Sequence, residues 1–309
     1  MYPMLCLLML GSTPVETITP ADVYVRVRQV RAELELIRSE MGRPVYQGWN
    51  PTISNAMPRQ VYFQARTMFE KTNQLCFELV RERGQPLKEP GGLIQPALVL
   101  DVVTATLERL KVIKAGLGIP EQVELPPRDP SKQPSDVILE IMHANRQINM
   151  LMDLGFSPGN VYREVTMSVH YAARLLALYP GVERLPAEPT MVRGKQPQDV
   201  YERLLDCFSL ASALSKQGHL EPLTLEVSPA GIERVIPSDV YDLAILIQAE
   251  LAYLHGQTHG VRPPRDSFYP GRKFPAHVYQ RTELLMEQLQ TLTQADRQRP
   301  NRLGRAYVP

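Results

Sequence analysis

The sequence predicts an all-α protein made by tandem duplication of a four-helix unit, with eight long amphipathic helices joined by long, proline-rich ordered loops. Three observations predict it. A short phrase built on proline and valine recurs eight times, an apolar stripe follows each copy, and the loops match pairwise at an offset of about 137 residues. Self-similarity at periods of roughly 20–50 residues is typical of repeated structural units.

The recurring phrase predicts where each helix begins. Proline is tolerated at the first helical position, and an aspartate two residues later can meet the free N–H groups and the positive end of the helix dipole. Aspartate fills that place in four copies. In chain order, the eight prolines are Pro20, Pro58, Pro96, Pro134, Pro158, Pro197, Pro237 and Pro275.

Each predicted helix continues in a charge-free stripe. Counted from the proline, positions +3, +7, +10, +14 and +17 carry no charged residue in any copy. This spacing is the seam of a helix packed in a bundle. In the first copy the stripe is Val23, Val27, Val30, Leu34 and Ile37. The polar exceptions are Thr72, Thr106, Ser168 and Thr282. Their hydroxyls can bond a carbonyl of the preceding turn.

Tyrosine follows the first stripe residue in six copies. The rings could line a binding site, but the sequence favours packing on a neighbouring helix or loop with the hydroxyl near water. The six are Tyr24, Tyr62, Tyr162, Tyr201, Tyr241 and Tyr279.

The loops divide the chain into two similar halves, each expected to form a four-helix bundle. The expected divisions are an apolar N-terminal segment with a linker at 1–19, a first bundle at 20–156, a second bundle at 157–296 and a C-terminal tail at 297–309. Only Gly155, Phe156 and Ser157 separate the fourth helix from the fifth. We therefore expect those two helices to be antiparallel neighbours, with Gly155 as a left-handed cap and Ser157 as the next N-cap.

The other connections are long enough to leave the helix directions open. Loops of roughly 15–20 residues can run back along a helix of similar length, which rises only about 30 Å. Parallel and antiparallel neighbours therefore both fit. Loops this long in a compact domain are uncommon unless they are ordered or functional.

The composition of the chain argues against some classes of binding partner. A formal charge of +1 over 309 residues argues against nucleic acid as the main partner. No segment is long and apolar enough to predict an integral membrane protein. The apolar run at 4–10 resembles the end of a secretory signal, although no Lys or Arg precedes Arg26. Export to the periplasm or outside is one expectation, and a cytoplasmic protein is the other.

The motifs of common active sites and metal centres are missing or incomplete. Glu140 and His143 form one half of a di-iron pattern without a partner copy, and His255 with His259 straddles an expected helix end. Cys6, Cys76 and Cys207 show neither metal-ligand nor disulfide spacing. We predict no catalytic residue, metal ion or cofactor from these patterns.

The feature most worth testing is a duplicated Pro-Pro-Arg-Asp loop. It ends in Arg128 and Asp129 in the first half and in Arg265 and Asp266 in the second. An arginine in a loop made rigid by two prolines could bind a carboxylate or phosphate, which makes these four residues candidates for ligand binding. The structural alternative, which the sequence favours, is that they bond to helix ends or to one another and fix the loop.

The sequence alone favours a non-catalytic binding or interaction protein for an unknown small molecule or protein, held on a surface or in a cleft between the bundles. Two alternatives stay open. One is a metal- or ligand-dependent enzyme with a site between helices, near His143, His170 or His255. The other is a structural assembly subunit with a large exposed apolar patch.

Overall fold

A computed structural model describes residues 17–45, 49–88, 93–152, 155–265, 271–300 and 302–304. The protein is 63% helix and 2% strand, so the all-α prediction is confirmed. Three sequence features fall outside the described residues: the apolar run at 4–10 with Cys6, residue Asp266, and the end of the C-terminal tail.

Each of the eight predicted long helices begins at its predicted proline. They are α1 (Pro20–Glu40), α2 (Pro58–Val80), α3 (Pro96–Leu117), α4 (Pro134–Leu151), α5 (Pro158–Leu176), α6 (Pro197–Gln217), α8 (Pro237–Gly256) and α9 (Pro275–Gln298). The predicted aspartates stabilise these starts. Asp136 Oδ2, for example, accepts a hydrogen bond from the backbone N–H of Gln133 at 2.8 Å. A free donor at the helix end is thereby satisfied.

The predicted stripes form the cores of the bundles. One layer in the first half consists of Leu34, Thr72, Leu110 and Ile148, all fully buried. The polar exceptions bond as expected. The hydroxyl of Thr72 donates to the carbonyl of Met68 at 2.8 Å, and that of Thr282 donates to the carbonyl of Val278 at 2.9 Å. Each hydroxyl is thus buried without losing a hydrogen bond.

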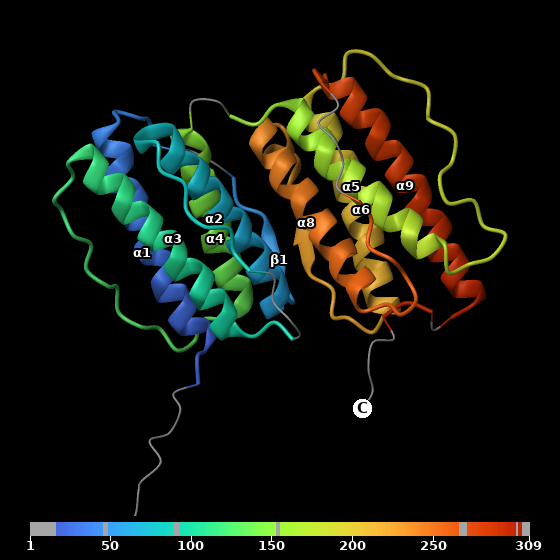
Figure 1. Cartoon of the computed structure of the whole chain (residues 1–309), viewed down its shortest axis with the longest axis horizontal. Coiled ribbons are helices and arrows are strands. Elements are labelled where there is room, and N and C mark those ends of the chain that lie inside the picture. The colour runs from blue at the N-terminus through green and yellow to red at the C-terminus, as the bar shows by residue number, and fades with distance from the viewer. Residues whose placement is uncertain are drawn as a thin grey trace, which may run out of the picture.

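All four long helices of each half run in the same direction. In the first half, the starting prolines and the valines three residues later meet around one small apolar hollow at the end of the bundle. The corresponding residues of α5, α6, α8 and α9 do the same in the second half. Because the helices begin at one end, the long loops must return to it, and in Figure 1 the loops that follow α3 and α5 run along the outer sides of the two bundles.

The two bundles share one arrangement of helices. In the first, α1 and α2 each contact both α3 and α4. In the second, α5 and α6 each contact both α8 and α9. The first two helices of each half are therefore diagonal partners, and so are the last two. Duplication predicts this shared arrangement, and duplication itself stays a prediction.

The expectation that the fourth and fifth helices pack as neighbours is wrong. Ser157 does cap α5, with its Oγ 3.4 Å from the backbone nitrogen of Asn160. Gly155 has a positive φ of 48°, but α4 ends at Leu151 with Met152 as its C-cap, so the expectation that Gly155 caps this helix is wrong. However, α4 and α5 belong to different bundles, and the two bundles meet instead mainly through α2 and α8. The short link makes α5 run opposite to α4, but it does not determine which helix faces pack together.

In the part of the chain that the structure describes, the loops add three short elements that the sequence does not predict. They are β1 (Thr52–Ser54), β2 (Thr224–Glu226) and the one-turn helix α7 (Pro229–Ile232). Strand β1 pairs antiparallel with β2, so that Ile53 lies opposite Leu225. One loop from each half thus forms a two-stranded ribbon beside the contact of α2 with α8 (Figure 1).

Candidate functional site

Within the described residues, three buried ion pairs join the two halves. Arg59 and Lys71 of α2 pair with Glu250 and Asp242 of α8, and Arg146 of α4 pairs with Asp239 of α8. Every cation comes from the first half and every anion from the second. The order of the pairs along the chain shows that α2 and α8 are antiparallel. Buried pairs of this kind favour one register, because a shifted register would leave charges unpaired.

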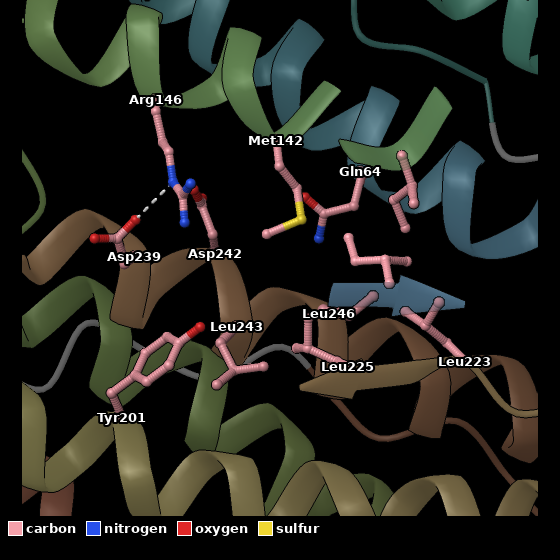
Figure 2. A pocket seen from close by; sticks show the side chains of 12 residues that line it. Gln64, Met142, Arg146, Tyr201, Leu223, Leu225, Asp239, Asp242, Leu243 and Leu246 are labelled. Carbon is pink, nitrogen blue, oxygen red and sulfur yellow. Dashed lines mark hydrogen bonds and ion pairs between the residues drawn. The ribbon is translucent and has the colours of Figure 1, made fainter. Parts of the chain in front are cut away.

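Arg146 is the most extensively bonded of these cations. Its Nε donates to Asp239 Oδ1 at 3.2 Å, its Nη1 donates to the carbonyl of Trp49 at 2.5 Å, and its guanidinium lies 4.3 Å from the Trp49 ring centroid. Figure 2 shows Arg146 reaching from α4 toward Asp239 above Tyr201 and Leu243. The hollow beside them holds only about 20 Å³. This is room for a water molecule, so this part of the interface is structural.

A much larger cleft opens beside that interface, with walls formed by α2, α5 and α8. Its volume is about 710 Å³. The lining from α2 and the following loop is Tyr62, Phe63, Arg66, Thr67, Glu70 and Ile94. The lining from α5 is Arg163, Glu164, Met167 and Tyr171. The lining from α8 is Tyr241, Ile245, Gln248, Ala249, Ala252, Tyr253, Gly256 and Gln257. Both halves of the chain are therefore needed to form it.

Small residues on α8 keep the cleft open. Ala249, Ala252 and Gly256 follow one another at helical spacing along the face that lines it. A Cβ atom added to Gly256 would meet no atom within 4 Å. On α3, the corresponding helix of the first half, Glu108 and Lys111 occupy the positions that match the two alanines. The hollow face is thus a property of α8 and not of the repeat.

One end of the cleft is aromatic. The ring centroids of Phe63 and Tyr253 lie 6.1 Å apart in an edge-on arrangement, and the guanidinium of Arg59 lies 5.6 Å from the Tyr253 ring centroid. Tyr62, which is 4% exposed, packs beside Phe63. Such rings offer apolar area with a polar edge, which suits binding of an organic molecule.

We call the other end of the cleft the acidic end, because the carboxylates of Glu70 and Glu164 lie there beside Arg66 and Arg163. Both carboxylates lie close enough to Tyr241 to affect its ionisation, and Glu70 lies close enough to Glu164 to affect the ionisation of that carboxyl. Burial raises the pKa of the Glu164 carboxyl, Arg163 opposes that rise, and Glu70 adds to it. Burial and the two carboxylates likewise raise the pKa of Tyr241. The Glu164 carboxyl and the Tyr241 hydroxyl are therefore both harder to ionise than in water.

Of the four predicted site residues, Arg128, Asp129 and Arg265 do not line this cleft, and Asp266 lies outside the described residues. Arg128 donates from Nε to Asp22 Oδ1 at 2.5 Å and from Nη2 to Thr19 Oγ1 at 2.9 Å. Asp129 accepts from the hydroxyl of Ser131 at 2.6 Å. These contacts fix the loop to the start of α1, as the structural alternative expects. Ligand binding by the four predicted residues stays a prediction.

Arg265 lies in a different setting from Arg128. Its side chain is exposed, and its backbone accepts a hydrogen bond from His170 on α5. Arg128, in contrast, contacts the first turn of α1. The duplicated loops therefore do not form equivalent anion grips within the described residues.

The histidines that the sequence analysis considered have structural neighbours. Although burial opposes ionisation, hydrogen bonds from His143 and Arg31 lower the pKa of Glu140 to about 2. His143 Nε2 lies 2.8 Å from Asn50 Oδ1, and His255 Nε2 lies 3.1 Å from the carbonyl of Arg262. Among the described residues, no group of three or more His, Cys, Asp or Glu side chains is arranged to hold a metal ion.

No family model, curated protein or solved structure matches this chain. In the part of the chain that the structure covers, no helix has the length and apolar character needed to cross a membrane. Function is therefore inferred from the geometry of the cleft.

The residues of the cleft were missed for a physical reason. Tyr62 and Tyr241 belong to the six recurring tyrosines, for which an aromatic lining was the less favoured interpretation. The run Ala249, Ala252 and Gly256 was a readable signal, since it leaves one helix face without bulk. That helix face can be recognised as a wall of the cleft only once α2 and α5 are known to lie beside it.

Proposed function

We propose that this chain is a non-catalytic binding protein that holds a small organic molecule in the cleft between its two halves. The supporting observation is the cleft itself, with about 710 Å³ of space. Pockets for small molecules usually have roughly 300–1,000 Å³ and combine aromatic walls with a few polar groups. The lining has this character, with Tyr62, Phe63 and Tyr253 beside Gln248 and Gln257.

The chemistry of the lining favours binding over catalysis. Within the described residues it contains no histidine, cysteine or serine, and its single hydroxyl-bearing aliphatic residue, Thr67, donates to the carbonyl of Phe63 at 3.1 Å. A nucleophile beside a general base is the arrangement that covalent catalysis needs. Glu164 and Glu70 can supply charge, which serves recognition equally well.

The location between two rigid bundles also supports a ligand site. The walls come from α2 in the first half and from α5 and α8 in the second. The buried ion pair of Lys71 with Asp242 lies close to the acidic end of the cleft and holds the walls together. Sites at the junction of two packed units are common, because the junction leaves a concave surface.

The proposal is tested by measuring the binding of a dye before and after a larger side chain fills the cleft. The probe is prodan, an uncharged naphthalene dye whose fluorescence shifts when it leaves water. We expect the native chain to bind it with a blue shift, and Ala252→Trp to abolish binding because the indole occupies the hollow. The matched control is Ala115→Trp, which adds the same bulk to an exposed site on α3 and should bind normally.

Circular dichroism checks that both variants keep the helical content of the native chain. Binding of prodan by Ala252→Trp as strong as that of the native chain would contradict the cleft as the site. Failure of the native chain to bind the dye would count against a small apolar ligand.

A further inference from the structure

The acidic end of the cleft holds a buried carboxylate with an incomplete counter-charge. The side chain of Glu164 is 12% exposed, and Nε of Arg163 lies 4.0 Å from its Oε1. That separation is too long for a hydrogen bond. Arg163 itself is 54% exposed, so water screens much of its charge. The Glu164 carboxylate can therefore accept a further positive charge.

Glu70 adds a second negative charge at the same end. Its Oε1 lies 3.0 Å from Nε of Arg66, one turn earlier on α2, and both side chains are substantially exposed. A pair in such a setting is weakly bound. Lys71, the next residue along α2, pairs with Asp242, so its positive charge does not neutralise Glu70 or Glu164.

An aromatic ring lies in a fixed position beside these carboxylates. The ring of Tyr241 stacks on Phe156, with the ring centroids 4.1 Å apart and the planes inclined by 15°. Stacking limits the motion of Tyr241, which also lines the cleft. An aromatic face next to a carboxylate is a setting that favours an organic cation, because the ring quadrupole and the carboxylate attract it together.

The cleft is also long. Tyr241 and Tyr253 are twelve residues apart on α8. At about 1.5 Å of rise per residue, this separation is about 18 Å along the helix. Ala249 and Ala252 lie between the two ends, so an apolar chain can pass from the acidic end to the aromatic end.

We propose that the cleft selects an elongated organic cation, with an ammonium or guanidinium group at one end and an apolar body. The positive group lies against Glu164 and the ring of Tyr241. The apolar body extends along Ala249 and Ala252 toward Tyr253. This inference rests on the proposed function, since it names the ligand class of the same site.

The test compares three probes that differ mainly in charge: phenylbutylammonium, phenylbutanol and phenylbutyrate. Dissociation constants are measured by titration calorimetry on the whole chain near neutral pH. We expect phenylbutylammonium to bind about tenfold more tightly than phenylbutanol, as one added charge-assisted contact implies. Phenylbutyrate should bind most weakly of the three.

Glu164→Gln keeps the size of the side chain and removes its charge. It should abolish the preference for phenylbutylammonium while leaving the affinity for phenylbutanol within about twofold. The matched control is Glu108→Gln on α3, which removes an exposed charge far from the lining and should change neither affinity. Ala252→Trp should weaken binding of all three probes.

The outcomes separate this inference from the proposal on which it rests. Binding of phenylbutanol that Ala252→Trp removes, with no preference for the cation, would sustain a binding cleft and overturn the cation assignment. An unchanged preference in Glu164→Gln would overturn it as well. Binding of none of the three probes would overturn both proposals.

Discussion

Arg146, near the end of α4, donates a hydrogen bond from Nε to Oδ1 of Asp239, in the first turn of α8, over 3.2 Å. The two side chains are 3% and 4% exposed. The other oxygen of Asp239 accepts the backbone N–H of Ile236 at 3.1 Å. One carboxylate therefore caps α8 and joins the two halves of the chain.

Arg146→Met should be strongly destabilising. It leaves Asp239 buried without its cation, and burial already raises the pKa of that carboxyl. Removing one partner of a buried pair costs about 3–5 kcal/mol of unfolding free energy. Denaturant titration measures the loss. Lys111→Met is the control, because Lys111 pairs with Glu108 on the exposed face of α3 and its loss should cost at most about 1 kcal/mol. Equal effects from the two substitutions would contradict a stabilising role for Arg146.

Leu110→Ala should lower the unfolding free energy, because the layers of four stripe residues stabilise each bundle. Leu110 is fully buried, and truncation leaves a cavity that three other helices must border. The expected cost is about 2–5 kcal/mol. Leu93→Ala, at a side chain that is 75% exposed, should change the unfolding free energy by no more than about 0.5 kcal/mol. Thermal unfolding of both variants followed by circular dichroism is the measurement. A loss below about 1 kcal/mol for Leu110→Ala would show that the layer is not packed as described.

Glu164→Gln should stabilise the unliganded protein at neutral pH. The pKa of Glu164 is raised in the folded state, so the folded state binds its proton more strongly than the unfolded state does. Folding is then penalised once the pH rises above the unfolded pKa, and the full penalty is present above the folded pKa. The ionisable groups that face this carboxylate are Arg163 and Glu70, which are charged at neutral pH, and Tyr241, which is neutral.

The measurement is the unfolding free energy of both proteins between mildly acidic and neutral pH. The advantage of Glu164→Gln should shrink as the pH falls and vanish below the unfolded pKa. An advantage that grows toward acidic pH would have the wrong sign. A stabilising substitution at this position is also typical of a residue kept for binding at a cost in stability.

Arg128→Ala tests the residue that the sequence singled out. Arg128 bonds to Asp22 and Thr19 and its side chain is 49% exposed, so the expected loss is no more than about 1 kcal/mol. The hydrogen bond from Arg128 is the main cause that lowers the pKa of Asp22, and that pKa should rise in the variant. Side-chain NMR titration of Asp22 measures the rise. Binding of prodan should be unchanged. A loss of prodan affinity in the variant would instead show that Arg128 contributes to ligand binding.

The sequence by itself determined the local structure and the cores. Pro20 and the seven prolines that match it set the helix starts, because their effect acts within one turn of backbone. The charge-free stripes gave the buried layers, since the face that a helix buries follows from its own periodicity. These signals are short-range, so they could be read without knowing which helices are neighbours.

Only the tertiary structure decided the parallel direction of the helices, their order around each bundle and the meeting of α2 with α8. The long loops permit either direction, and similar stripes on all the helices do not select a partner. The cleft depends on residues far apart in the chain, such as Glu70, Glu164 and Ala252. No local pattern marks them as a group, because they become neighbours only when the buried ion pairs fix how the two halves dock.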